Sequence, residues 1–276
     1  MSILDEILDT KRREVAQAKS QTPLEELKAR IAASPRPRNF FRAVARPASP
    51  PIPATKAVKL IAEVKRASPS AGVIRADFDP AAIARAYADA GADALSVLTD
   101  SPYFQGKLDD LVAVRQAVKL PVLRKDFIID AYQVYQSRAA GADAVLLIAE
   151  ALETSRLIDL QILATELNMT CLIEVHDVEN LMRVRDQVIG FPHPSYSLLG
   201  INNRDLRTFQ TDLGTTLRMC ELVADRGVLV SESGIKTAQD VRKLADAGVA
   251  AVLIGEELMR SGNIKAKIAE MFGDNR

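Results

Sequence analysis

Six short apolar stretches of this chain each end on charged, polar or glycine residues. Strands of a parallel sheet are covered on both faces and therefore read as continuous apolar runs. In a (β/α)8 barrel the carboxyl ends of such strands surround the active site. The pattern thus predicts that six distant segments form a single site; they are 60–62 before Glu63 and Lys65, 120–123 before Arg124 and Lys125, 171–173 before Glu174, 198–201 before Asn202 to Arg204, 228–230 before Ser231 to Gly234, and 250–254 before Gly255.

From residue 60 onward the chain alternates between strand and helix patterns. Segments 90–95, 140–145 and 247–252 are close repeats, each ending a helix on glycine and opening a strand. Helix starts precede each of them or lie between them, at Asp79-Pro80, Glu153-Thr154 and Lys236-Thr237. We predict eight strands, near residues 60–65, 94–98, 121–124, 144–148, 170–174, 198–201, 228–231 and 251–254.

Eight strand–helix units predict an α/β fold, the (β/α)8 TIM barrel. A doubly wound open sheet is the alternative, but no Gly-x-Gly-x-x-Gly follows the first strand. We expect residues 56–276 to form this barrel and residues 1–55 to form an N-terminal helical extension with a proline-rich connector.

The N-terminal segment carries its own apolar stripe. Ile3, Leu4, Ile7 and Leu8 predict a first helix, and Pro23 suits the start of a second helix over 24–31. The proline-rich stretch 34–55 suits an extended connector. We expect the barrel's own helices to occupy its sides and lower face, so that the N-terminal helices dock on the upper rim.

Composition limits the possible partners. The 276 residues contain 36 Lys and Arg against 36 Asp and Glu, which argues against general attraction to nucleic acid. No apolar run approaches the roughly 20 residues that span a bilayer, and the N-terminus lacks a secretion signal. We therefore expect a cytoplasmic protein that has no membrane contact, with Cys171 and Cys220 as buried apolar residues.

Four ionisable residues at strand ends are the strongest candidates for catalysis. Glu63 and Lys65 share a strand face, and Lys125 and Glu174 end two other strands. Burial without partners would be costly, so acid–base chemistry explains these residues better than core packing does. Surface salt bridges are the alternative. Metal binding is disfavoured because no His and carboxylate cluster stands at the strand ends.

Two glycine-containing turns predict a phosphate site. Ser233-Gly234 follows the seventh strand and Gly255 the eighth, where barrel enzymes often bind phosphate. Glycine lets an oxyanion approach backbone N–H groups, and a helix start favours negative charge. Ordinary turn glycines remain the alternative.

Several loop residues suit substrate contacts. The loop 66–72, which includes Ser68, is small and polar, as expected of a substrate-covering loop. Phe104 and Phe127 suit a ring-bearing substrate or the core, and Asn202 and Arg204 suit a carboxylate. For His176 we expect a solvent-facing or helix-start role.

These motifs, in this order, resemble the indole-3-glycerol-phosphate synthase family. The resemblance covers nearly the whole chain and is carried by 61–70, Leu123 to Phe127, Glu174 to His176, Gly200 to Leu206 and Ser231 to Ile235. It implies decarboxylating, dehydrating ring closure of 1-(2-carboxyphenylamino)-1-deoxyribulose 5-phosphate without a cofactor. It also implies Lys125 as general acid, Glu174 as its acid–base partner, and Glu63 with Lys65 for dehydration and carboxylate contact.

The resemblance extends to the binding residues. It implies Ser68, Phe104, Phe127, Asn202 and Arg204 along the substrate, and Ser233, Gly234, Gly255 and Glu256 at the phosphate. Glu256 departs from members that have serine or threonine at its position, so only its backbone N–H is expected to serve.

Other readings stay open. The chain ends soon after the predicted eighth helix, which indicates no fused isomerase domain, and a monomer is compatible with these expectations. A sugar-phosphate isomerase and a catalytically silent binding barrel are the competing functions. The lysine pair disfavours the first, and Lys125 with Glu174 disfavours the second.

Overall fold

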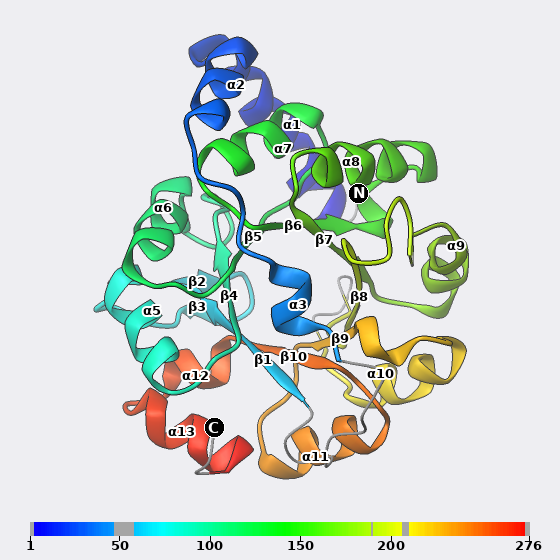
Figure 1. Cartoon of the computed structure of the whole chain (residues 1–276). Helices are drawn as coiled ribbons and strands as arrows, with labels where there is room; N and C mark the ends of the chain where they lie inside the picture. The colour runs from blue at the N-terminus through cyan, green and yellow to red at the C-terminus, as the bar shows by residue number, and fades with distance from the viewer. Residues whose placement is uncertain (1–2, 47–57, 189, 206–209, 274–276) are drawn as a thin grey trace.

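Eight parallel strands close into a barrel, as predicted, and the open sheet is excluded (Figure 1). The computed structural model describes residues 3–46, 58–188, 190–205 and 210–273. The strands follow one another around the barrel in chain order: β1 (Lys59–Val64), β4 (Ala94–Leu98), β5 (Val122–Lys125), β6 (Ala144–Ile148), β7 (Thr170–Val175), β8 (Ser197–Asn202), β9 (Leu229–Glu232) and β10 (Ala251–Ile254).

Helices surround the strands and begin where the sequence predicts. Asp79 caps α5 by accepting hydrogen bonds from the N–H groups of Ala81 and Ala82, and Thr237 caps α11. Cys171 and Cys220 are buried, as expected. The helices are α5 (Pro80–Asp89), α6 (Leu108–Ala117), α7 (Ala131–Ala139), α8 (Thr154–Glu166), α9 (Val178–Val188), α10 (Gly214–Met219), α11 (Ala238–Asp246), α12 (Glu256–Arg260) and α13 (Ile264–Phe272), with short 3-10 turns η1 (Ala149–Ala151), η2 (Cys220–Leu222) and η3 (Arg226–Val228).

The barrel interior is built in layers from alternate strands, as is usual for this fold. An apolar layer consists of Ile61, Leu123, Leu172 and Val230, all fully buried. Two residues further along the same strands, side chains again point inward. That upper layer consists of Glu63, Lys125, Glu174 and Glu232.

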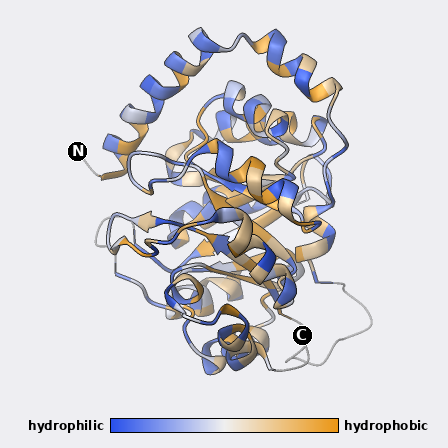
Figure 2. Cartoon of the chain, turned by 90° about the vertical axis from the view of Figure 1, so that its left-hand side faces the viewer, coloured by the Kyte–Doolittle hydropathy of each residue, from blue (hydrophilic) through white to orange (hydrophobic). Residues whose placement is uncertain are grey.

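Helix α1 (Ile3–Gln21) lies at the carboxyl ends of the strands, where it shares a cavity with Glu63, Lys125 and Glu174, so the expected docking on the upper rim is confirmed for α1. Its residues Ile3, Leu4 and Ile7 line the central cavity. Helix α2 (Leu24–Ala32) then passes beside α7, where the Tyr132 hydroxyl donates to the carbonyl of Thr22. Figure 2 shows these two helices crossing the edge of the barrel.

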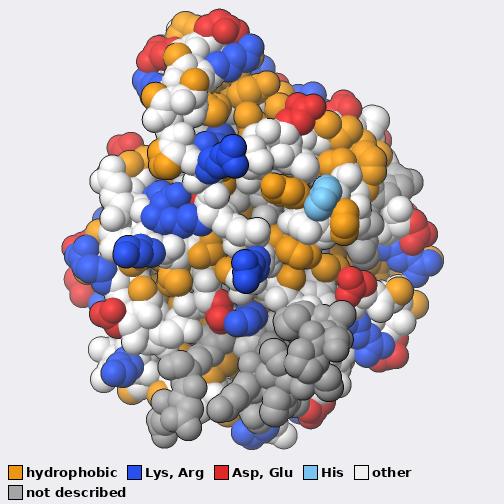
Figure 3. Space-filling model, viewed as in Figure 1, with side chains coloured by type: hydrophobic (Ala, Val, Ile, Leu, Met, Phe, Trp, Pro, Cys, Tyr) orange, Lys and Arg blue, Asp and Glu red, His pale blue; other side chains and the backbone are white. Residues whose placement is uncertain are grey.

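A short helix, α3 (Phe40–Val44), covers the opposite end of the barrel (Figure 1). Phe40 and Val44 are fully buried among residues at the amino ends of the strands, including Ala94 and Ala251. The expected extended connector over 34–55 is therefore wrong at 40–44, and its part over 47–55 lies outside the described residues. The lower face is also not closed by the barrel's own helices, because these pack around its wall. Figure 3 shows this face, where basic and acidic side chains are mixed.

A buried ion cluster fixes α1 to the barrel. Lys11 is 3% exposed, and its Nζ lies 2.9 Å from both Asp100 Oδ2 and Asp126 Oδ1. Burial disfavours the ammonium, but Asp126 and Asp100 outweigh this effect and raise the pKa of Lys11. Asp126 also binds Arg124 at 2.9 Å. In the described part of the chain, no helix has the length and apolarity to cross a membrane.

We expect Lys11→Met to lower the free energy of unfolding by about 3–5 kcal/mol, because it leaves two buried carboxylates without their shared cation. Lys19→Met on the same helix is the control. It removes an exposed pair with Asp130, which should be worth at most about 1 kcal/mol. Urea denaturation measures both changes, and equal effects would contradict the importance of the cluster.

Candidate active site

One cavity of about 550 Å³ opens at the carboxyl ends of the strands. Its volume is in the range of small-molecule sites. Every site residue predicted from the sequence lines it: Glu63, Lys65, Ser68, Phe104, Lys125, Phe127, Glu174, Asn202, Arg204, Ser233, Gly234, Gly255 and Glu256. Further residues that were not predicted as site residues also line the cavity, among them Ser70, Thr211, Glu232, Lys236 and Arg260.

Lys125 lies between two carboxylates. Its Nζ donates to Glu174 Oε2 at 2.8 Å and lies 3.3 Å from Glu232 Oε2. Burial alone would favour the neutral amine, but Glu174, Glu232 and Glu63 outweigh it and raise the pKa of Lys125. Lys125 is therefore an ammonium at neutral pH.

The two carboxyl groups beside Lys125 differ in protonation. Burial opposes ionisation of both. At Glu174, Lys125 and His176 overcome burial and lower the pKa well below its usual range. At Glu232, burial and the charge of Glu174 raise the pKa to about 8 against the pull of Lys125. Neither oxygen of Glu232 has a hydrogen-bond partner among the described residues.

A second ion pair stands beside this group. Lys65 Nζ lies 2.8 Å from Glu63 Oε2, and Glu63 is 4% exposed. Gly255 makes room for this pair, because a Cβ there would overlap the Glu63 carboxylate. Gly255 has an ordinary negative φ of −122°. Space for Glu63 is thus one reason for glycine at 255, besides the predicted approach of a phosphate.

His176 is not solvent-facing, so that expectation is wrong. Its side chain is 7% exposed, directly after β7. Nδ1 lies 3.1 Å from Glu150 Oε2, and Nε2 lies 3.2 Å from Glu174 Oε1. Contact with the carboxylates of Glu150 and Glu174 explains its low exposure.

The turn after β9 has an unusual backbone. Ser233 and Gly234 have φ values of 66° and 74°, and a left-handed serine is strained. Asn203 holds this turn, since its amide donates at 3.0 Å to the carbonyl of Ser233. Such strain is typical of ligand-binding turns.

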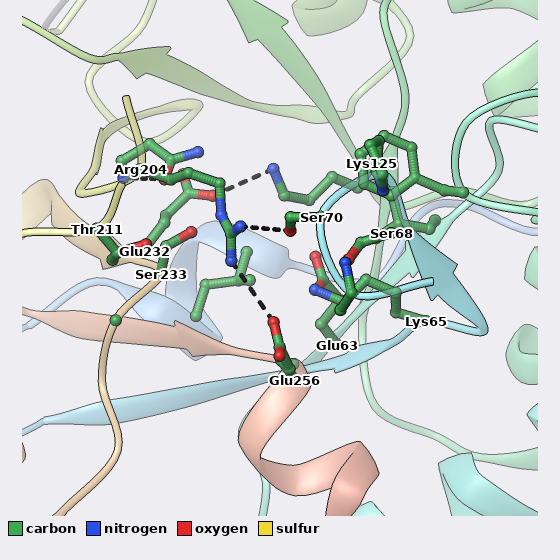
Figure 4. A pocket seen from close by; sticks show the side chains of 18 of the residues that line it. Glu63, Lys65, Ser68, Ser70, Lys125, Arg204, Thr211, Glu232, Ser233 and Glu256 are labelled. Carbon is green, nitrogen blue, oxygen red and sulfur yellow. Dashed lines mark hydrogen bonds and ion pairs between the residues drawn. The ribbon is translucent and has the colours of Figure 1, made fainter. Parts of the chain in front are cut away.

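Arg204 connects the loop after β1 to the end of β10 (Figure 4). One terminal nitrogen donates to Ser70 Oγ at 2.7 Å, and the other lies 3.5 Å from Glu256 Oε2. Ser70 belongs to the tip of a hairpin formed by β2 (Ala67–Ser68) and β3 (Gly72–Val73). Glu256 also binds Arg260 at 3.1 Å. The side-chain charge of Glu256 is thus shared between two arginines.

An apolar wall faces the turn after β9 across the cavity. Phe104 and Phe127 follow β4 and β5, and their ring centroids lie 6.3 Å apart. β5 stands opposite β9 in the barrel order. Further apolar side chains from α1 and the strands line the cavity: Ile3, Leu4, Ile7, Leu98, Leu146, Ile148 and Leu253. No group of three or more His, Cys, Asp or Glu side chains suited to a metal ion occurs in the described ranges.

Comparison with known sequences decides the family. The sequence model of "Indole-3-glycerol phosphate synthase" matches residues 4–271. The chain belongs to this family. It is also 50% identical over 264 residues to the indole-3-glycerol phosphate synthase of Rhodopirellula baltica, with 96% of each chain covered.

Solved structures place the synthase fold among other barrels. A 3-hexulose-6-phosphate synthase has a TM-score of 0.60 at 16% identity, covering 78% of this chain and 98% of its own. A thiamine phosphate pyrophosphorylase from Pyrococcus furiosus has a TM-score of 0.57 at 15% identity, covering 79% of this chain and 96% of its own. At such identities the likeness shows the fold alone.

In this member of the synthase family, the sequence pattern could have identified one further site residue, Glu232. Glu232 ends an apolar strand as Glu174 does, so the same rule would have selected it. The contact between His176 and Glu150 had a weaker signal, because it depends on how β6 and β7 align.

We expect Gly255→Ala to destabilise the protein by about 1–3 kcal/mol, because the new methyl group displaces Glu63 from its pair with Lys65. Gly262→Ala is the matched control, since its Cβ would meet nothing within 4 Å and should change stability by less than about 0.5 kcal/mol. Thermal unfolding and turnover report the two effects. Full activity in Gly255→Ala would show that Glu63 needs no defined position.

Proposed function

We propose that this chain converts 1-(2-carboxyphenylamino)-1-deoxyribulose 5-phosphate into indole-3-glycerol phosphate, with Lys125, Glu174, Glu63 and Lys65 as its acid–base residues. Membership of the family gives the activity, that of a carboxy-lyase in tryptophan biosynthesis acting on a small phosphorylated substrate. The roles of the individual residues are the proposal.

Ring closure begins at the substrate carbonyl. The ring carbon that bears the carboxylate attacks the carbonyl carbon, and a carbon–carbon bond forms while the nitrogen becomes an iminium. The carbonyl oxygen takes a proton from Lys125. The raised pKa keeps Lys125 protonated until the oxygen becomes an alkoxide, a stronger base than an amine. Lys125 is the cation at the centre of the ionisable layer and thus suits this role.

Carbon dioxide and water then leave. The bond to carbon dioxide breaks, and its electron pair neutralises the iminium. The new hydroxyl departs as water after protonation, while the carbon beside the nitrogen loses a proton to a base, which completes the indole. Glu174, held ionised, suits the base, and Lys65 paired with Glu63 suits the acid for the hydroxyl.

Glu232 adds a substrate contact to this set. It is 1% exposed and lines the cavity; its Oε2 is paired with Lys125, but its Oε1 has no hydrogen-bond partner among the described residues. A buried carboxyl group of this kind requires a partner. A hydroxyl group of the sugar chain would supply one.

The remaining surfaces suit the ends of the substrate. The apolar wall with Phe104 and Phe127 matches the aromatic ring. Asn202 and Arg204 offer hydrogen-bond donors and a cation for the carboxylate or the sugar chain. Ser68 lies in the hairpin that Arg204 contacts through Ser70, so this hairpin can cover the bound substrate.

The phosphate is assigned to the opposite side of the mouth. The strained turn at Ser233-Gly234 and the backbone at Gly255-Glu256 would bind its oxygens, and Lys236 and Arg260 line the same part of the cavity. Backbone donors serve at Glu256, because its carboxylate would repel a dianion.

The observation that carries the proposal is Lys125 held between Glu174 and Glu232 inside a barrel of this family. The test adds the carboxyphenylamino-deoxyribulose phosphate to purified protein and follows indole fluorescence. An initial rate of fluorescence increase that is proportional to enzyme concentration supports the function. No fluorescence increase with the folded protein contradicts the function.

We expect Lys125→Met to reduce kcat by about 10²–10⁴-fold, because it keeps the length of the side chain and removes the acid. Binding of a substrate analogue, measured by calorimetry, should change far less. Lys119→Met, at an exposed lysine, is the control. Near-normal turnover in Lys125→Met would show that another residue is the acid.

We expect Ser233→Asp to raise KM for the substrate by at least about tenfold, because it places a negative charge beside the phosphate dianion. Steady-state kinetics measure KM, and circular dichroism checks the fold. Ser195→Asp, at an exposed serine, is the control. An unchanged KM would place the phosphate elsewhere.

A further inference from the structure

A chain of alternating charges runs from Lys125 to a residue outside the cavity. Lys125 contacts Glu174 Oε2, and the other oxygen of Glu174 lies 3.2 Å from His176 Nε2. His176 in turn contacts Glu150, which belongs to η1 after β6. His176 and Glu150 therefore form a layer behind the acid–base residues.

Glu150 holds His176 at two points. Its Oε1 accepts the backbone N–H of His176 at 2.9 Å, and its Oε2 lies 3.1 Å from the ring nitrogen Nδ1. Glu150 is itself held in place, because Arg183 of α9 donates to the carbonyls of Ala149 and Leu152 on either side of it. The orientation of the imidazole ring is thus fixed by the protein before any substrate binds.

The two contacts of the ring determine its charge. An ionised carboxylate can only accept hydrogen bonds, and a neutral imidazole has a proton on one nitrogen alone. Glu150 lies within hydrogen-bond distance of Nδ1, and Glu174 lies 3.2 Å from Nε2 as an ion pair without hydrogen-bond alignment. A carboxylate on each side of the ring favours the imidazolium, the one form of the ring that carries a positive charge. The raised pKa of His176, about 10, agrees: burial lowers it, but Glu150 and Glu174 outweigh burial.

His176 and Glu150 distinguish two otherwise similar carboxyl groups. Glu174 and Glu232 both end alternate strands, both are at most 2% exposed, and both approach Lys125. Glu174 has the histidine cation behind it. For Glu232, the only ion pair within the described residues is that with Lys125. One negative charge beside Lys125 will therefore reside on Glu174.

We infer that His176, oriented by Glu150, is the positioning residue that keeps Glu174 rather than Glu232 ionised beside Lys125. His176 does not reach the reacting atoms in this assignment. It rests on the proposed function only in giving Glu174 the role of base. The charged groups packed around His176 are Glu150 of η1 and Glu174 of β7, with Arg183 of α9 beside η1; the adjacent Asp177 is exposed.

The first test needs no variant. The chain has two histidines, so a nitrogen-15 NMR titration of the imidazoles resolves both. We expect His176 to stay doubly protonated from pH 5 to pH 8, with the exposed His193 observed beside it as the second imidazole. A His176 that becomes neutral within this range, or is neutral throughout, would overturn the inference whatever the activity of the protein.

The second test is the pH dependence of kcat/KM in His176→Gln. The amide keeps a hydrogen-bond donor and removes the positive charge, so Glu174 is easier to protonate. We expect the acidic limb of the profile to shift to higher pH by about one unit or more. We also expect kcat to fall by a larger factor than KM changes. The substrate's own ionisations are common to all variants, so only the difference is interpreted.

Glu150→Gln and His193→Gln complete the series. Glu150→Gln should lower the pKa of His176 in the nitrogen-15 titration, because the imidazolium loses one of its two carboxylates. His193→Gln should move nothing. Equal losses at every pH in folded His176→Gln would indicate a merely structural histidine and overturn the inference. A wild-type protein inactive on the substrate would instead overturn the proposed function, and the NMR titration would still decide the state of His176.

Discussion

The charge of Lys125 is the constraint on which the rest of the site depends. Three carboxyl groups, of Glu63, Glu174 and Glu232, share its layer of the barrel interior, where water cannot solvate them fully. A single ammonium between two of them makes their burial tolerable, and its own burial is tolerable only because of them. Three carboxyl groups thus share one ammonium, and this excess of acidic groups has two consequences. Glu232 keeps a proton near neutral pH, and cations outside the layer are recruited: Lys65 beside Glu63 and His176 beside Glu174.

The N-terminal segment turns this layer into an enclosed site. Helix α1 supplies apolar side chains to the mouth of the barrel, while α3 closes the opposite end with Phe40. The buried cluster around Lys11 connects these roles. Lys11 binds Asp126, which stands in the chain between Lys125 and Phe127, one a proposed acid and the other part of the apolar wall. Loss of α1 would therefore expose the cavity and also loosen the segment that carries Lys125. Stability and substrate binding should be coupled here, because they depend on the same contacts.

Strand positions and most site residues were predictable because each is a local signal. A buried parallel strand reads as an apolar run, and the residue that ends it faces the site, so Glu63, Lys125 and Glu174 could be selected without a structure. Helix α3 could not be predicted, since five residues among prolines show no period and its burial comes only from packing on the barrel. His176 is an intermediate case. It stands two residues after Glu174, so strand alternation already placed both on one side, but its partner Glu150 comes from a neighbouring segment. Contacts of this kind depend on how neighbouring strands align, and the sequence alone does not reveal that alignment.

Bulky ionisable groups on alternate strands also restrict the strands between them. A Cβ at Gly200 of β8 would overlap Glu232, and a Cβ at Gly255 after β10 would overlap Glu63. Gly200 lies within β8, beside β9 with Glu232, and Gly255 directly follows β10, which pairs with β1 and its Glu63. The glycine at 255 therefore serves two demands at once, space for a carboxylate on one side and, in the proposed function, close approach of a phosphate on the other. A larger residue there would displace the acid–base group before it affected the phosphate, so the interior charge layer constrains this position at least as strongly as the ligand does.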